Sequence, residues 1–362
     1  MTKRSLIKNF DIWLFLTTVL LLGVGVAVIH SATYHLGSTT NYTARQFMWA
    51  GIGIMVLLLV LAVDYKVLNR LAYLFYFINI GLLVFVLVAG KAVLGAQRWL
   101  HLGVFSFQPS ELAKVVIIMV LARYLGDRKG HISLSCLVCT FVFVLIPMIL
   151  VVQQPDLGTA LVMLPILLAV LYIAGVSKKY LVTLVGAGLV VAPFLWFILK
   201  DYQKSRLLVF VNPNADPLGA GYATNQARIA IGSGGFFGKG WLSGTQTQLR
   251  FLPENRTDFV FATIGEEFGF IGSVIILGLY AFIIIRGLQT AQQAKDMPGK
   301  LLAGGISVML LMHVFVNVGM ALGIMPVVGL PLPLISYGGS CLVTTMLSIG
   351  FLINIRMRRF TF

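Results

Sequence analysis

The stretch FLPENRTDFVFATIGEEFGF, residues 251–270, joins a long polar segment to an apolar run and marks the boundary around which the chain is organised. It carries four of the 12 acidic residues, namely Glu254, Asp258, Glu266 and Glu267. Carboxylates at the mouth of a membrane helix are costly and are usually kept for a function. Spacing alone leaves two roles open for Asp258, a helix cap or a catalytic group. Glu266 and Glu267, about 12 Å further along the helix axis, either pair with internal cations or relay protons.

The composition indicates a membrane protein. The 362 residues are 59% hydrophobic and 11% charged, with a mean hydropathy of +0.94. Repeated apolar runs near twenty residues then predict an all-α polytopic membrane protein. The net charge of +15 is spread over short loops rather than gathered on a folded domain, so no nucleic-acid partner is expected. Cys136, Cys139 and Cys341 lie in or beside apolar runs without a nearby His in the C-x-x-C pair, which favours packing over metal binding.

About ten transmembrane helices are predicted within a single domain, residues 1–362. The first apolar run is too long for the core of a signal peptide, so we expect a retained span. The expected spans are 12–30, 47–63, 72–90, 110–125, 134–152, 157–174, 181–199, 259–285, 301–322 and 341–355.

The basic residues predict the orientation of these spans. Cytoplasmic segments are enriched in Lys and Arg. On this rule the inner side holds Lys3, Arg4, Lys8, Lys66, Arg70, Arg128, Lys129, Lys178, Lys179, Lys295, Lys300, Arg356, Arg358 and Arg359. The short loops on the other side hold only Arg45, Lys91 and Arg98. Both termini are therefore expected in the cytoplasm.

One connection is much longer than the others. Residues 200–258, between predicted helices 7 and 8, are polar and Gly-rich and lie on the outer face. Loops of this length are usually functional or disordered, and the aromatic residues here argue against disorder. Tyr222–Ile231 is predicted to form a short amphipathic helix with Arg228 on its wet side. A phosphate-binding P-loop is rejected for GSGGFFGKGW, since Ser233 and Gly240 replace the residues that the motif requires.

Two further outer-face segments contain charged groups near helix starts. In the first, residues 95–100 read GAQRWL and residues 107–114 read FQPSELAK. A structural interpretation makes Ser110 a helix cap and pairs Glu111 with Lys114. A functional one has Lys114 and Arg98 offer cations to a phosphate at the membrane surface, and both can hold together. The second segment, residues 153–159, reads QQPDLGT, where Asp156 is favoured as a helix cap.

A third segment is irregular. Residues 326–340 read PVVGLPLPLISYGGS, and their prolines and glycines cannot form a regular helix. Irregular backbone at membrane depth persists only where protein or a watery cavity covers it. We therefore expect this segment to form a wall of a substrate groove.

These motifs together resemble the SEDS family of bacterial membrane proteins for shape, elongation, division and sporulation. The resemblance covers nearly the whole chain and is carried by GAQRWL, FQPSELAK, QPDLGTA, DPLGAGY, GSGGFFGKGWLSGTQTQL, FLPENRTDFVFATIGEEFG and GLPLPLISYGGS, in that order. The segments GWLSGTQTQLRFLPE and GIMPVVGLPLP look like the elongation branch. One departure is Arg256, where the family often has His.

The resemblance implies a peptidoglycan glycosyltransferase of the bacterial inner membrane that polymerises lipid II during lateral wall elongation, with its active site in the periplasm. The family's required aspartate matches Asp258, and its conserved Arg, Glu and Lys match Arg98, Glu111 and Lys114. The candidate substrate-binding residues are Arg98, Trp99, Gln108, Ser110, Glu111, Lys114, Gln154 and Ser340. No cofactor is certain; a divalent cation, Mg or Mn, is left open. The implied partners are a class B penicillin-binding protein and the rod-complex proteins MreB, MreC and MreD.

The implied reaction has an expected mechanism. An α-linked donor that gives a β-1,4 product requires inversion, and a carboxylate general base is the expected tool. Two alternatives are weighed against it, a lipid II flippase and a non-catalytic scaffold for the penicillin-binding protein. Transporters often have broken helices with polar residues at the midplane. Here no span has a clearly broken centre, and the polar residues gather on one side.

Overall fold

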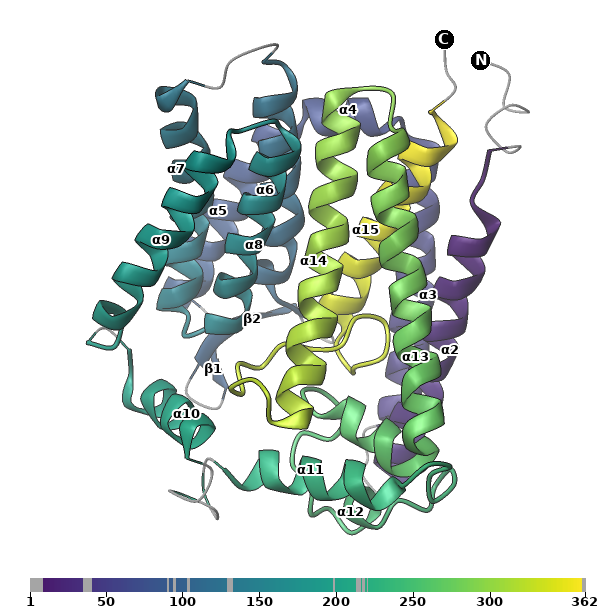
Figure 1. The fold of residues 1–362 in the computed structure, drawn as a ribbon. Coiled ribbons are helices and arrows are strands. Elements are labelled where there is room, and N and C mark those ends of the chain that lie inside the picture. The colour runs from purple at the N-terminus through teal and green to yellow at the C-terminus, as the bar shows by residue number, and fades with distance from the viewer. Residues whose placement is uncertain are drawn as a thin grey trace.

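The computed structural model describes residues 9–34, 41–89, 91–93, 96–102, 105–128, 133–197, 199–212, 216, 219 and 221–359. Most of these residues form a bundle of long helices, shown in Figure 1. The start of α2 and the end of α15 lie at one end of the bundle, and α10, α11 and α12 lie at the other (Figure 1). The basic residues Lys3, Arg4, Lys8 and Lys129 lie outside the described residues.

The helices follow the predicted order. They are α2 (Ile12–Thr33), α3 (Tyr42–Ala62), α4 (Tyr65–Arg70), α5 (Ala72–Ala89), α6 (Pro109–Gly126), α7 (Leu134–Gln153), α8 (Leu157–Ile173), α9 (Lys178–Leu195), α10 (Asp201–Val211), α11 (Tyr222–Gly234), α12 (Thr245–Gln248), α13 (Val260–Gln293), α14 (Met297–Leu322) and α15 (Gly339–Met357). Each predicted span falls on one long helix, with ends that differ by up to eight residues. α4 was not predicted.

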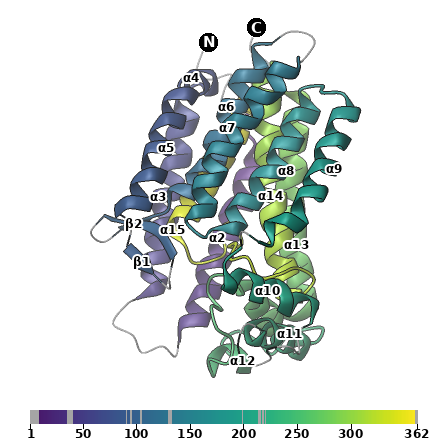
Figure 2. The ribbon, with the colours of Figure 1, turned by 90° about the vertical axis from the view of Figure 1, so that its left-hand side faces the viewer.

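Seven of the described helices are long and apolar enough to cross a membrane, which makes the chain an integral membrane protein: α2, α3, α5, α7, α13, α14 and α15. The other three predicted spans correspond to α6, α8 and α9, of 18, 17 and 18 residues. Figure 2 shows these three running alongside the spans. The count of ten spans stays a prediction. Large apolar side chains such as Leu189 and Phe77 face outward, as expected for a lipid-facing surface.

The centre of the bundle consists of α6, α14 and α15. In the apolar windows of α14 and α15, 67% and 83% of the residues are buried. Small residues let these helices approach their neighbours, since a Cβ at Gly305 would lie 2.7 Å from the Ile118 side chain. Polar side chains that lie on these central helices are therefore removed from lipid and from water.

The end of the bundle that holds α10 to α12 also carries a small sheet. It is antiparallel, with the order β1-β2-β3: β1 (Lys91–Val93), β2 (Ala96–Leu102) and β3 (Phe105–Phe107). No pattern in the sequence predicted this sheet. Within the described part of the long connection, α11 confirms the predicted amphipathic helix, and Arg228 on it is exposed.

α13 contains a break that the sequence analysis did not predict. Gly269 takes φ 66° and ψ −161°, nearer to the first turn of α13 than to its middle. Residues 235–238 lie against the break, where Phe270 N donates to the Gly235 carbonyl at 2.9 Å. A Cβ at Gly269 would lie 2.3 Å from Gly238 N. Glycine is required because the backbone needs both the positive φ and the close approach.

Candidate active site

Asp258 lies directly before α13 without capping it. The N-cap position of α13 is Phe259, and no side chain caps the helix. The capping explanation for Asp258 is therefore wrong. Its loop is held from behind: Asn317 Nδ2 donates to the Asp258 carbonyl at 2.9 Å, and Ser336 Oγ donates to the Thr257 carbonyl at 2.6 Å. The main chain around the carboxylate is thus fixed by α14 and by the irregular segment 326–340.

The carboxylate of Asp258 faces residue Gly329 of this irregular segment. A Cβ at Gly329 would lie 3.5 Å from Asp258 Oδ2. The side chain is partly exposed, and no described residue gives its carboxylate a hydrogen bond or an ion pair. Removal from water, together with the charge of Glu254, raises the pKa of Asp258 to about 6, against the opposing effect of Arg206 and Arg98. A carboxylate with this pKa is ionised at neutral pH and is a stronger base than an ordinary aspartate.

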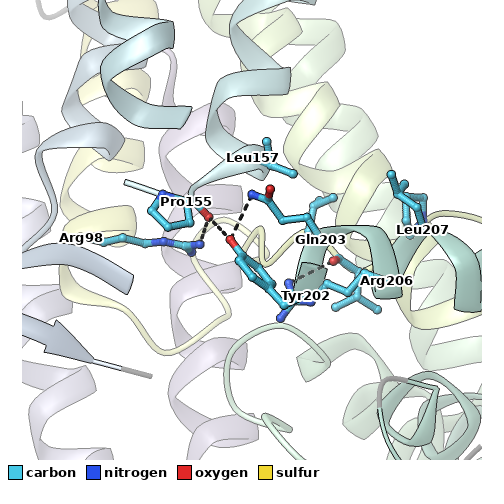
Figure 3. A pocket seen from close by; sticks show the side chains of 10 residues that line it. Arg98, Pro155, Leu157, Tyr202, Gln203, Arg206 and Leu207 are labelled. Carbon is cyan, nitrogen blue, oxygen red and sulfur yellow. Dashed lines mark hydrogen bonds between the residues drawn. The ribbon is translucent and has the colours of Figure 1, made fainter. Parts of the chain in front are cut away.

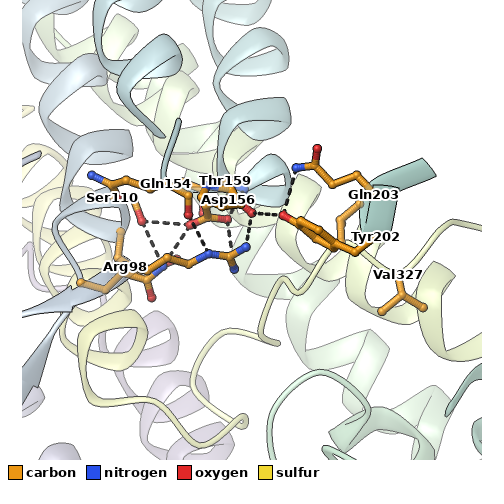
Figure 4. Close-up of polar contacts among 12 residues, drawn as sticks. Arg98, Ser110, Gln154, Asp156, Thr159, Tyr202, Gln203 and Val327 are labelled. Carbon is orange, nitrogen blue, oxygen red and sulfur yellow. Dashed lines mark hydrogen bonds and ion pairs between the residues drawn. The ribbon is translucent and has the colours of Figure 1, made fainter. Parts of the chain in front are cut away.

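Arg98 is placed by the start of α8. Its Nε donates to the Gln154 carbonyl at 3.1 Å, and Nη2 donates to the Pro155 carbonyl. Its Nη1 lies 4.0 Å from Asp156 Oδ1. Figure 4 shows the guanidinium of Arg98 beside Asp156. The motifs GAQRWL and QQPDLGT therefore meet at one place in the structure. The prediction that Asp156 caps α8 is confirmed, since Thr159 N donates to its Oδ1 at 3.3 Å.

Ser110 and Gln108 join the same network, although not as predicted. Ser110 is not the cap of α6; Gln108 occupies that position without a capping hydrogen bond. Ser110 Oγ instead donates to Asp156 Oδ2 at 3.0 Å, and Gln108 Nε2 does the same at 3.0 Å. Ser340 Oγ accepts from Gln108 N at 3.0 Å. The carboxylate of Asp156 thus connects α6, α8 and β2.

A cavity lies between Arg98 and helix α10. Its lining residues are Arg98, Pro155, Leu157, Tyr202, Gln203, Arg206, Leu207, Pro326, Val327 and Val328. Tyr202 Oη donates to the Pro155 carbonyl at 3.0 Å, the same atom that Arg98 contacts (Figure 3). Arg206 Nη1 donates to the Val327 carbonyl at 3.1 Å. Two arginines, from β2 and from α10, therefore line one cavity beside the segment that Asp258 faces.

Lys114 was predicted to offer a cation to a phosphate at the membrane surface, and in the structure it is paired inside the protein; the phosphate contact stays a prediction. Its side chain is fully buried, and Nζ lies 2.8 Å from Glu111 Oε1 and 2.8 Å from His313 Nε2. Since an ammonium only donates, the His313 Nε2 must be the unprotonated ring nitrogen. The predicted pairing of Glu111 with Lys114 is confirmed, and it ties α6 to α14.

Two further candidates have mainly structural contacts. The side chain of Gln154 is buried and its Nε2 donates to the Leu83 carbonyl at 2.9 Å, so only its main-chain oxygen faces Arg98. Trp99 is half-buried on β2, next to Arg98. Sequence reasoning missed Tyr202, Arg206, Asn317 and His313. The first two lie in the long connection without a motif, and the last two lie inside an apolar span, where polar residues are themselves the signal.

Glu266 anchors part of the long connection, residues 200–258. Its carboxylate accepts from Lys239 Nζ at 2.9 Å, Gln246 N at 2.8 Å and Thr247 N at 3.0 Å. Pairing with a cation, one of the two roles left open, is thus confirmed for Glu266. Glu267 is also buried and accepts from Ser31 Oγ. Among the described residues, no three His, Cys, Asp or Glu side chains are grouped so as to hold a metal ion.

The sequence is similar to a known family over almost its whole length. The FtsW/RodA/SpoVE family, described as cell cycle proteins, matches residues 12–360. The peptidoglycan glycosyltransferase MrdB of Escherichia coli K12 is 41% identical over 356 residues, which is 97% of this chain and 94% of MrdB. The peptidoglycan glycosyltransferase RodA of Treponema pallidum is 34% identical over 429 residues, which is 98% of this chain and 99% of that protein.

Two solved structures share the fold. One belongs to a peptidoglycan synthase complex that coordinates polymerization and crosslinking; the TM-score is 0.85 and the identity 32%, over 98% of this chain and 99% of that one. The other is the crystal structure of the rod shape determining protein RodA of Thermus thermophilus, with a TM-score of 0.74 and 30% identity over 98% of both chains.

Proposed function

Because the chain belongs to the FtsW/RodA/SpoVE family, the SEDS proteins, we propose that it is a peptidoglycan glycosyltransferase that polymerises lipid II into β-1,4 glycan strands during lateral wall elongation, with Asp258 as its general base. The observation that carries the assignment of Asp258 is its geometry. Its main chain is fixed by Asn317, while its carboxylate has no hydrogen-bond or ion-pair partner among the described residues. A partly buried carboxylate without a partner is costly, and this cost supports a chemical role for Asp258.

The reaction requires one proton acceptor. The 4-hydroxyl oxygen of the acceptor sugar forms a bond to C1 of the donor sugar, while the bond from C1 to the diphosphate oxygen breaks. The hydroxyl proton passes to Asp258, and the diphosphate leaves with the bonding electron pair. Attack from the face opposite the leaving group inverts the anomeric configuration, as in inverting glycosidases. General base catalysis of this kind contributes about 10²- to 10⁴-fold to the rate.

The leaving diphosphate needs positive charge, and Arg98 and Arg206 are the candidates. Both line the cavity beside segment 326–340, and both oppose the rise in the pKa of Asp258. Arginine binds phosphate through paired N–H groups, which suits an anion that gains charge in the transition state. Arg98 is oriented by the carbonyls at Gln154 and Pro155, so the cation is in place before substrate binds.

The buried group Glu111–Lys114–His313 has a positioning role in this proposal. It lies between α6 and α14, and Asn317, one turn further along α14, holds the Asp258 loop. Ser110 and Gln108, at the start of α6, hold Asp156 beside Arg98. α6 therefore contacts α14, which supports the Asp258 loop, through this buried group, and it contacts Asp156, which lies beside Arg98, through its first residues. A divalent cation stays a prediction; the steps above use only side chains of the protein.

The setting is proposed from the same premise. A likeness to a peptidoglycan synthase complex supports a class B penicillin-binding protein as partner. MreB, MreC and MreD remain predicted partners. The distribution of basic residues supports cytoplasmic termini, which puts the end of the bundle that carries α10 to α12 and Asp258 in the periplasm.

A polymerisation assay tests the proposal. Purified protein and fluorescent lipid II, with a transpeptidase-inactive class B penicillin-binding protein, should yield long glycan strands. Asp258→Asn should yield none while it still binds the partner. If Asp258→Asn polymerises normally, the general base is misassigned. If the parent protein moves lipid II across the liposome membrane without making polymer, it is a flippase. The break in α13 at Gly269 would favour that role.

A further inference from the structure

A second cavity, of about 170 Å³, lies beside the loop that leads to Asp258. It is lined by the end of α2, by α12 and by the loop between α12 and α13. The lining residues are Ala32, Thr247, Gln248, Arg250, Leu252, Pro253, Glu254, Asn255 and Arg256. Most of them are polar or charged, and two are arginines. The composition of the wall favours a polar, negatively charged ligand over a lipid tail.

Arg256 is held in place on this wall. Its guanidinium lies over the ring of Tyr42, 4.4 Å from the centroid. The ring of Tyr337 packs edge-on against Tyr42 with a centroid distance of 5.3 Å, and Tyr337 N donates to the Arg256 carbonyl at 2.8 Å. Stacking occupies the face of a guanidinium and leaves its N–H edges available. No described residue forms a hydrogen bond or an ion pair with these N–H groups.

The rest of the wall is also fixed. Gln248 Nε2 donates to the Ser31 carbonyl at 3.1 Å, and Thr257 Oγ1 donates to Glu254 Oε2 at 2.9 Å. Arg250 and Glu254 have φ values of 62° and 50°, which non-glycine residues rarely adopt. Such strain persists only where surrounding contacts enforce it, and it is common at binding sites. The cavity is therefore formed before any ligand binds.

The two cavities are formed by different parts of the chain. They share no lining residue: the first is formed by α8, α10 and residues 326–328, and the second by α2, α12 and residues 250–256. Figure 1 shows α10 at the lower left of the bundle, α12 at the bottom and α2 on the right. Arg256 is two residues from Asp258 along the chain. Asp258 is in neither lining, but its pKa responds to Glu254 of the second cavity as well as to Arg206 and Arg98 of the first, so its carboxylate lies within electrostatic range of both.

We propose that this second cavity is the acceptor subsite and that Arg256 binds an anionic group of the acceptor, either a carboxylate of its peptide or a phosphate of its diphosphate. This inference rests on the proposed function, because an acceptor subsite has meaning only for a transferase. Arg256 acts as a binding residue that positions the acceptor, while Asp258 takes the proton. The charged lining residues are Arg250, Glu254 and Arg256, so their formal charges sum to a net positive value.

Steady-state polymerisation with two substrates tests this subsite. One is lipid II with free peptide carboxylates, and the other is lipid II with those carboxylates amidated. A charge-assisted hydrogen bond contributes about 1.5–3 kcal/mol, so Arg256→Gln should raise KM by at least about tenfold, with a smaller change in kcat. Arg256→Lys, which keeps the charge, should recover part of the loss. Arg228→Gln, at an exposed arginine of α11 outside this cavity, is the matched control and should leave KM unchanged.

The two substrates distinguish the sources of the anion. If a carboxylate is bound, amidation raises the KM of the parent protein, and Arg256→Gln adds little to it. If a phosphate is bound, Arg256→Gln raises KM equally for both substrates. A KM within twofold of the parent for both substrates would overturn the inference. The melting temperature of Arg256→Gln, compared with that of the parent, controls for loss of folding. In the Asp258→Asn background, added Arg256→Gln should weaken the equilibrium binding of fluorescent lipid II, and an unchanged affinity again overturns the inference.

The proposals for the acceptor subsite and for the general base can be rejected independently. If Asp258→Asn keeps full polymerisation, the proposed base is wrong whatever the KM of Arg256→Gln. If Asp258→Asn is inactive and Arg256→Gln has the KM of the parent, only the acceptor subsite is wrong.

Discussion

Asn317 Nδ2 donates to the main-chain carbonyl of Asp258 at 2.9 Å and to that of Leu330 at 2.8 Å. One buried amide of α14 therefore joins the loop of the proposed base to the irregular segment 326–340. Asn317→Ala removes both hydrogen bonds and leaves two carbonyls without this donor, at a cost of about 1–3 kcal/mol for each buried group. We expect kcat for polymerisation to fall at least tenfold while KM changes little. A kcat equal to that of the parent would show that the loop needs no such support.

The raised pKa of Asp258 predicts the pH dependence of the reaction. A general base works only when ionised, and the pKa of Asp258 is about 6. The single-turnover rate should therefore be constant well above pH 6 and fall about tenfold per pH unit below it. Measurements between about pH 5 and 8 check this. A rate that stays flat down to pH 5 would contradict the assignment.

The same pKa predicts an effect on stability. Because the folded state raises the pKa of Asp258, it binds the proton more tightly than the unfolded chain does, and the ionised carboxylate destabilises the fold. This cost grows as pH rises from the ordinary aspartate value of about 4 to about 6, and it is constant above. Asp258→Asn removes it, so at neutral pH the variant should melt at or above the temperature of the parent. A clear drop in melting temperature would indicate that the carboxylate is structural.

The buried pair of Lys114 and Glu111 predicts a non-additive double mutant. Lys114 is fully buried and Glu111 nearly so, at 3% exposure. Lys114→Met leaves the Glu111 carboxylate without its cation, which costs about 3–5 kcal/mol in buried pairs, whereas removal of both charges is often close to neutral. Lys114→Met should therefore lower the melting temperature much more than Lys114→Met with Glu111→Gln. Equal losses in the single and double variants would contradict the pairing.

The hydrogen bonds of Glu266 predict that this residue keeps part of the long connection ordered. Its carboxylate accepts five hydrogen bonds: one each from Lys239, Thr245 and Gln246, and two from Thr247. Glu266→Ala should release residues 239–248, seen as faster amide hydrogen exchange there and as faster proteolysis. Lys239→Met should have a smaller effect, because the other donors remain. Unchanged exchange in Glu266→Ala would show that other contacts hold this segment.

Hydrophobic patterning predicted the long helices well, because a span of apolar residues has few alternatives in a membrane. Amphipathic spacing predicted α11, and the Pro-Asp pair at a helix start predicted the cap at Asp156. The small sheet was missed, since strands as short as Phe105–Phe107 leave almost no periodic signal. The break at Gly269 was missed because it depends on residues 235–238, whose approach no local pattern reports.

Within the site, the errors have one cause, which is contact between distant segments. Ser110 was predicted to cap α6, but Asp156 lies within reach and takes its hydroxyl. Lys114 was expected to face a phosphate, and no pattern in the sequence indicated that its side chain is buried against His313, 199 residues further along the chain. Residue chemistry identified which groups matter. Tertiary contacts decide which of them face the cavity and which lie behind it.

The most direct test of the general base is chemical rescue. Asp258→Ala removes the carboxylate and leaves room for a small acid, so added formate should restore lipid II polymerisation in a saturable manner, while the parent protein and Arg228→Gln gain nothing from it. The variant without formate should be at least about 100-fold slower than the parent. Polymerisation by Asp258→Ala at the rate of the parent, with no need for formate, would contradict the role of Asp258.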